Sequence, residues 1–168
     1  MKKWWSIGVL IGLLLLLSAC GDQTSSENLA QLKEHYPTLK NQLNELSQEQ
    51  LEQIKVPDYI PFEVTDVQAI TSSENPSHIE IIFTNGQLNL HVMTMSHQGE
   101  LYTSDTGIDL QNGAHAKFKM NEFGNELQWS KESESRAYIV KLMAYPPSQP
   151  QQFTKEDVIK IANSMYKM

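Results

Sequence analysis

The sequence predicts an α+β protein in which a curved antiparallel β-sheet of about six strands packs against N-terminal helices and a C-terminal helix. Three observations lead to this class. After residue 26, apolar residues recur with helical spacing near both ends of the chain. Between these ends they alternate with polar residues, as in half-buried strands. The pair Asn85-Gly86 separates two such alternating runs, which is a strong signal for a hairpin and hence for antiparallel pairing.

The first nineteen residues have the organisation of a secretory signal peptide. Lys2 and Lys3 precede an apolar run from Ile7 to Leu17, which is too short for a membrane-spanning helix of about 20 residues. The four residues from Leu17 to Cys20 resemble the bacterial lipobox at every position. The resemblance implies that the Cys20 thiol carries a diacylglyceryl group and that the chain is cut before it. An ordinary signal peptide with an incidental cysteine is the alternative, and the position of the chain's only cysteine favours lipidation.

This interpretation divides the chain into three parts: a lipoprotein signal peptide (1–19), a lipidated tether (20–26) and a single α+β domain (27–168). Two acyl chains would anchor the protein stably to the extracytoplasmic face of the cell membrane. Loss of Lys2 and Lys3 with the signal peptide changes the formal net charge from −7 to −9. An acidic domain argues against nucleic acid as a partner and against adhesion to anionic lipids. Acylated Cys20 leaves no thiol for a disulfide, a metal or a nucleophile.

The region 27–55 is predicted to be helical. Leu29, Leu32 and Tyr36 share a helical face, and Pro37 interrupts the pattern, so we expect two helices or one kinked helix. Ser47 and Gln50 have the spacing of a capping box and predict the start of a last short helix. The helices are expected to pack on the sheet. Their polar face is mixed rather than basic, which disfavours the alternative of a membrane-proximal partner helix.

The region 56–150 is predicted to be mainly β. Two prolines make 56–62 an extended connection into a strand over 63–70. The clearest hairpin spans 77–96, and a two-residue turn at Asn85-Gly86 would set Phe83 opposite Leu88 and Glu80 opposite His91. Further alternating runs predict strands over 114–120, around 127–129 and over 136–145. The segment 154–166 begins with acidic residues and carries one apolar stripe, which predicts the C-terminal helix.

Several of these segments resemble a known but uncharacterised family. They are Val56-Pro57-Asp58-Tyr59-Ile60-Pro61-Phe62, Ile81-Ile82-Phe83-Thr84-Asn85-Gly86, Leu127-Gln128-Trp129 and the run from Thr154 to Met165. Together they are similar to a domain of unknown function found in lipoproteins and anti-sigma-factor-like membrane proteins of Bacillus-type Gram-positive bacteria. The resemblance covers roughly residues 56–165. It implies a non-enzymatic extracytoplasmic α+β domain and provides no catalytic residues.

Motifs with catalytic potential are isolated. Asp105-Thr106-Gly107 matches the aspartic-protease triplet, but that chemistry needs two carboxylates and the chain has one copy, so a homodimer would have to supply the second. A plain turn is the favoured interpretation. Ser164 and Lys167 match Ser-x-x-Lys at the C-terminus without companion motifs. We therefore expect no catalytic residues.

The histidines and aromatic residues are expected to have structural or surface roles. No two histidines have a ligand-like spacing, so we expect no metal or cofactor; the five are His35, His78, His91, His97 and His115. Four aromatic residues are assigned to the sheet core in preference to a ligand platform: Phe118, Phe123, Trp129 and Tyr138. The predicted function is a non-enzymatic, membrane-anchored binding module that presents a surface or sheet edge to a protein partner. The alternative is a carrier or chaperone for an apolar ligand or lipid in a pocket under the curved sheet.

Overall fold

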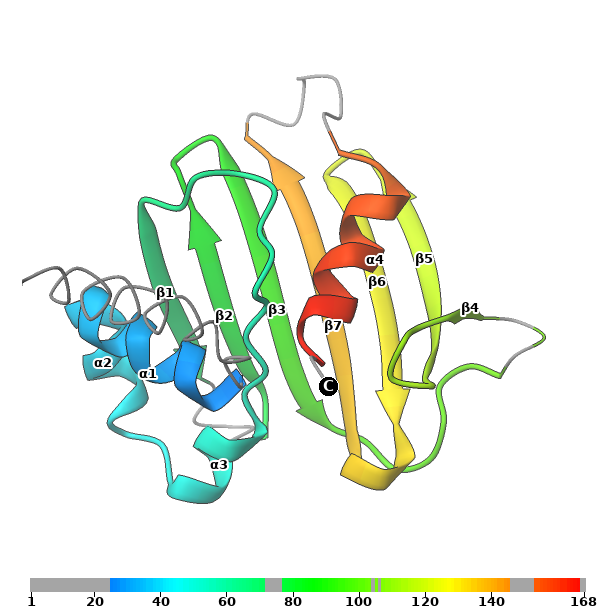
Figure 1. Ribbon diagram of the computed structural model, residues 1–168, viewed down its shortest axis with the longest axis horizontal. Helices are drawn as coiled ribbons and strands as arrows, with labels where there is room; N and C mark the ends of the chain where they lie inside the picture. The colour runs from blue at the N-terminus through cyan, green and yellow to red at the C-terminus, as the bar shows by residue number, and fades with distance from the viewer. Residues whose placement is uncertain (1–24, 72–76, 104, 106, 146–152, 167–168) are drawn as a thin grey trace, which may run out of the picture.

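The computed structural model describes residues 25–71, 77–103, 105, 107–145 and 153–166, which form one open sheet with helices on one of its faces (Figure 1). The elements are α1 (Ser25–His35), α2 (Pro37–Leu43), α3 (Gln48–Gln53), β1 (Asp66–Thr71), β2 (Ile79–Thr84), β3 (Leu88–Ser96), β4 (Ile108–Asp109), β5 (His115–Asn121), β6 (Gly124–Lys131), a 3-10 turn (Glu132–Glu134), β7 (Arg136–Ala144) and α4 (Lys155–Ser164). The predicted α+β class is confirmed, although the sheet has seven strands and not six. The additional strand is the two-residue β4.

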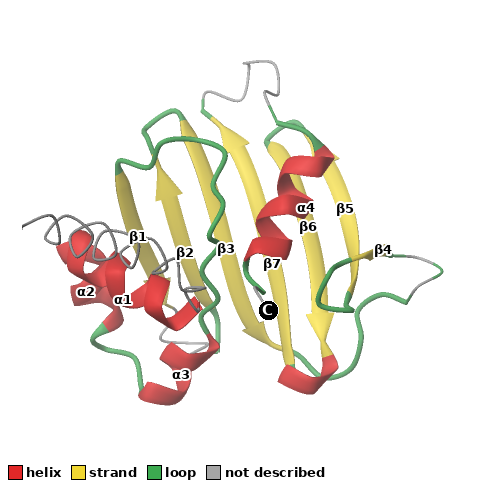
Figure 2. Ribbon diagram, viewed as in Figure 1, coloured by secondary structure: helices red, strands yellow, loops and turns green. Residues whose placement is uncertain are grey.

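The sheet consists of two meanders that meet at its centre. Its order is β1-β2-β3-β7-β6-β5-β4, and every neighbouring pair is antiparallel. The two longest strands, β3 and β7, join the meanders through nine paired positions from Leu88–Ala144 to Ser96–Arg136. Figure 2 shows α4 crossing one face of this sheet and α1 on the same side, near the ends of β1 and β2.

The core lies between the helices and the face of the sheet that they cover, which we call the inner face. Side chains alternate across a strand, so every second residue of the central strands points inward and is buried. The fully buried large side chains on this face are Ile79, Ile81, Phe83, Leu90, Leu127, Trp129, Tyr138 and Leu142. Their burial provides the main driving force for folding.

The helices form two groups over the inner face. Pro37 occupies the first turn of α2, where its missing N–H costs nothing, and so separates α1 from α2 as the sequence predicts. The capping box of α3 is present as expected, since Ser47 Oγ accepts from Gln50 N at 3.2 Å. At the other end of the chain, α4 begins at its own capping box on Thr154 and packs on β6 and β7.

The extended segment 56–64 runs across the inner face between the two helix groups (Figure 1). The backbone N–H of Tyr59 donates to Ser164 Oγ at 3.2 Å, and Lys160 Nζ lies 3.7 Å from the centre of the Tyr59 ring. Val56, at the start of the segment, is 2% exposed. The two prolines therefore hold an extended chain that joins the helix groups, consistent with the predicted connection.

The hairpin of β2 and β3 is present, but its predicted register is wrong by two residues. Phe83 lies opposite Leu90 and not Leu88, and His91 lies opposite Ile82 and not Glu80. The loop Asn85–Gln87 holds three residues, and Asn85 Oδ1 accepts from the backbone N–H groups of both Gln87 (3.0 Å) and Leu88 (2.8 Å). This Asx-type turn replaces the tight two-residue turn.

Candidate functional site

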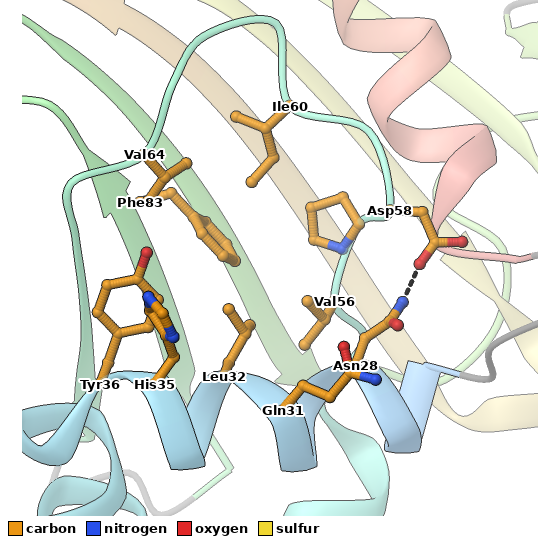
Figure 3. Close-up of a pocket in the computed structure, with 11 residues that line it drawn as sticks. Asn28, Gln31, Leu32, His35, Tyr36, Val56, Asp58, Ile60, Val64 and Phe83 are labelled. Carbon is orange, nitrogen blue, oxygen red and sulfur yellow. Dashed lines mark hydrogen bonds between the residues drawn. The ribbon is translucent and has the colours of Figure 1, made fainter.

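A pocket of about 450 Å³ opens between α1, the segment 56–64 and the inner face of β2 (Figure 3). It is lined by Asn28, Gln31, Leu32, His35, Tyr36, Val56, Pro57, Asp58, Ile60, Val64 and Phe83. The volume falls in the range of about 300–1,000 Å³ that is usual for small-molecule sites. Three separate stretches of sequence therefore form one concave site.

The inner part of the pocket is apolar. Phe83 on β2 and Val56 on the extended segment are 1% and 2% exposed, and Leu32 points toward them from α1 (Figure 3). Ile60 and Val64 close the side formed by the segment (Figure 3). The strand places Phe83 inward by its two-residue alternation, and the helix places Leu32 inward one turn after Asn28. An apolar group that enters the pocket would be removed from water on several sides.

Polar side chains gather at the α1 side of the pocket. Asn28 Nδ2 donates to Asp58 Oδ1, and this bond ties the first part of α1 to the extended segment (Figure 3). The rings of His35 and Tyr36 lie edge to face with their centres 5.2 Å apart. In the described part of the chain, the Tyr36 hydroxyl and the Gln31 amide make no hydrogen bond to protein. Both groups can therefore bond to the polar end of a ligand.

The polar groups of the pocket are not arranged for acid–base or nucleophilic chemistry. Asp58 accepts from the Asn28 amide, and the described residues that line the pocket include no serine, threonine or cysteine. A nucleophile needs a base within hydrogen-bond distance, and no hydrogen bond joins two titratable side chains among the described lining residues. Among the described residues, no cluster of three or more His, Cys, Asp and Glu side chains is placed to hold a metal ion. The arrangement is suited to binding.

Among the residues singled out for covalent or catalytic chemistry, those that the structure describes do not line this pocket. Cys20 and the signal peptide lie outside the described residues, as do Thr106 and Lys167. Asp105 is exposed in the connection between β3 and β4. Ser164 is engaged at the end of α4, where its hydroxyl donates to the backbone oxygen of Ile161 at 2.7 Å.

Two of the five histidines pair with carboxylates on the face of the sheet opposite the helices. His91 Nδ1 bonds to Glu80 Oε1 diagonally across β2 and β3, and this bond holds the pKa of Glu80 below its usual range. His115 Nδ1 lies 2.8 Å from Asp109 Oδ1. These contacts give both rings a structural partner. Of the five histidines, His35 lines the pocket.

The aromatic residues assigned to the core have two different locations. Trp129 and Tyr138 stack with ring centres 5.5 Å apart, and the edge of Tyr166 packs on both. Burial raises the pKa of Tyr138 and of Tyr166, and the Tyr138 hydroxyl donates to the Glu134 carboxylate. Phe123 contradicts the prediction: it is 51% exposed because it occupies the turn between β5 and β6 rather than a strand.

The pocket was not identified from the sequence. Leu32 and Tyr36 carry the same apolar pattern as any packing helix, and 56–62 was assigned as a connection. The available signal was the composition of that connection, which combines two prolines with four apolar or aromatic residues over seven positions. A rigid apolar segment that cannot join a helix or a central strand must pack elsewhere, and here it forms a wall.

No helix among the described residues is both long and apolar enough to cross a membrane. Comparison of the chain with protein-family models, curated proteins and solved structures finds no match. The functional argument therefore depends on the site itself.

Proposed function

We propose that this protein is a membrane-anchored lipoprotein that acts as a non-enzymatic binding module on the outer face of the cytoplasmic membrane. We further propose that the pocket beside α1 is its binding site for a lipid-like ligand, so that the protein serves as a carrier or chaperone. The observation that carries this proposal is the pocket, with Val56 and Phe83 buried inside it. At its α1 side lie the Tyr36 hydroxyl and the Gln31 amide, which make no hydrogen bond to the described part of the chain. Apolar walls with a few polar groups are typical of ligand sites.

The position of the pocket in the chain supports a membrane-derived ligand. Asn28 lies eight residues after Cys20, so a lipid on Cys20 would hold this pocket residue within about 28 Å of the anchor even if the chain between them were fully extended. A ligand leaving the bilayer would travel a short distance. The acidic charge of the domain would limit its adhesion to anionic headgroups.

The ligand experiment is native mass spectrometry of the full chain, purified in mild detergent from bacterial membranes without delipidation. We expect a non-covalent adduct of lipid mass. Leu32→Trp fills the pocket from α1 and should abolish the adduct, whereas Ile70→Trp, on the exposed outer side of β1, should retain it. An adduct that both variants retain equally would place the lipid elsewhere and refute the carrier function.

The anchor is tested separately by Cys20→Ala. We expect this variant to lose incorporation of labelled palmitate and to keep residues 1–19, because the thiol is the atom that becomes acylated. A processed, membrane-bound Cys20→Ala chain would contradict the lipoprotein assignment without affecting the pocket.

A further inference from the structure

The two long edges of the sheet are protected unequally. At the β1 edge, α2 packs along the strand and Gln42 Oε1 accepts from the backbone N–H of Ala69 at 2.8 Å. At the opposite edge, β4 pairs with only His115 and Ala116 of β5. Among the described residues, Lys117–Asn121 has a neighbouring strand on one side alone (Figure 1). Bare edges of this kind are templates for another strand.

The free backbone groups of this edge belong to Phe118 and Met120. Successive residues of a strand direct their backbone groups to opposite sides. Leu110 N donates to Ala114 O at 2.9 Å, so Ala114 faces the β4 side, and by alternation Phe118 and Met120 face it too. Two N–H and two C=O groups thus point away from β6. No described residue forms a hydrogen bond with them.

The side chains beside this edge differ between the two faces. Phe118 and Met120 lie on the inner side, and Met120 is 69% exposed. Lys117 and Lys119 lie on the outer side. Lys119 Nζ is 3.1 Å from Gln128 Oε1 and 3.8 Å from Glu126 Oε1.

These side chains determine which strand fits. A second copy paired at the same edge would set its own Lys117 and Lys119 against Lys117 and Lys119 on the outer face. Like charges directly opposite each other are destabilising, so self-pairing is disfavoured. Acidic residues at the same positions would be favourable, and apolar residues on the other face would cover Phe118 and Met120.

We propose that the free part of β5, Lys117–Asn121, accepts an extended segment of a partner protein as an added strand, and that acidic and apolar residues alternate in this segment. Backbone hydrogen bonds to Phe118 and Met120 provide the attachment, and the alternation of side chains provides the selectivity. The site is separate from the pocket, and it does not depend on the carrier function.

The test measures binding of a short fluorescein-labelled peptide of alternating glutamate and valine to the full chain in detergent micelles, by fluorescence anisotropy. Met120→Pro removes one outward N–H, and loss of one backbone hydrogen bond should weaken binding by about tenfold. Met120→Ala keeps that N–H and should weaken binding by less than about threefold. Lys117→Glu combined with Lys119→Glu should reverse the preference, so that a peptide of alternating lysine and valine binds more tightly.

Hydrogen exchange on the unmodified chain provides a second readout that does not need a variant to fold. On peptide binding, the amides of Phe118 and Met120 should gain protection, while those of Lys117 and Lys119, which face β6, should stay unchanged. The proposal is overturned if amide protection does not alternate along β5 in this way, or if Met120→Ala and Met120→Pro lose equal peptide affinity. It is also overturned if the lysine peptide binds the unmodified chain more tightly than the glutamate peptide. Dimerisation through this edge without peptide would refute the choice of partner.

Discussion

Two glycine substitutions test how closely β6 and β7 approach at the start of β6. Gly124 has φ +149°, and a Cβ built on it would lie 2.1 Å from the backbone oxygen of Leu142, a distance that no relaxed structure permits. Gly86, in the β2–β3 loop, has φ +86° with no atom within 4 Å of the added Cβ. Gly86→Ala should therefore cost only backbone strain of about 1–2 kcal/mol. Gly124→Ala adds overpacking of about 1–3 kcal/mol to backbone strain of about 1–3 kcal/mol, so we expect a loss of about 4 kcal/mol within a range of about 2–6 kcal/mol.

Urea denaturation measures both values. Trp129 is the only tryptophan after Trp5, and it is fully buried against Tyr138, so its fluorescence reports unfolding of the sheet in a chain that lacks residues 1–19. The expected loss for Gly124→Ala is a large part of the 5–15 kcal/mol that is usual for a folded domain. If the two variants differ by less than about 1 kcal/mol, β6 and β7 are not in close contact at Gly124, and the reasoning fails.

Three further predictions concern a pair of side chains, two buried phenols and a helix cap. Glu80→Gln should lower the free energy of unfolding by about 1 kcal/mol at pH 7, because it removes the carboxylate that bonds to His91. That bond lowers the pKa of Glu80 in the folded state, so its contribution to the free energy of unfolding is present above about pH 4.5 and is lost as the pH falls through the lowered pKa. The urea midpoint of Glu80→Gln should therefore change less on acidification than the midpoint of the unmodified chain. Burial raises the pKa of Tyr138 and Tyr166 above 10, so their contribution to the free energy of unfolding is fully present below pH 10 and decreases above it. Ultraviolet titration of the folded protein should find two phenols that ionise only on unfolding. If all six phenols of the chain titrate together near pH 10, the prediction is contradicted. Thr154→Ala removes the capping box of α4 and should cost about 1 kcal/mol in urea, while an unchanged midpoint would mean that the cap is irrelevant to stability.

The fold class was predictable because several independent local patterns in the sequence indicate it. Helical spacing, strand alternation, the capping box at Ser47 and the acidic residues after Thr154 act within a few residues, and each local pattern agrees with the same architecture. β4 was not predicted, because two residues paired with β5 are too short to show any alternation. Such a strand is defined by its neighbour and not by its own sequence.

The register of the β2–β3 hairpin shows the limit of pattern reasoning. A slip of one residue would move Phe83 and Ile81 to the wrong face, but a slip of two residues keeps both buried, so alternation alone cannot separate the two registers. The choice depended on whether Asn85-Gly86 forms a tight turn. Instead, the Asn85 side chain accepts two backbone hydrogen bonds and stabilises a longer loop.

The pocket was harder to predict than the fold because local patterns fit a packed core and a cavity wall equally well. Leu32, Val56 and Phe83 each satisfy a local rule for burial, and nothing in their sequence surroundings distinguishes a wall of a cavity from a packed core. The cavity exists because the rigid segment 56–64 and α1 approach β2 without filling the space between them. That is a property of three segments together, so it appears only in the structure.

The two proposed sites lie toward opposite sides of one sheet, and this has a functional consequence. The pocket reaches the sheet at β2, and the free edge belongs to β5, four strand spacings away in the order β2-β3-β7-β6-β5. At about 4.8 Å per spacing, the two sites are separated by about 19 Å across the sheet. α1 begins at Ser25, within the last two residues of the predicted tether, so the pocket lies on the part of the fold nearest to the proposed anchor in sequence. A ligand in the pocket and a partner strand on β5 can therefore be bound at the same time. An occupied pocket that changed the peptide affinity of β5 would require coupling through the nine-residue pairing of β3 with β7, the contact that joins the two meanders.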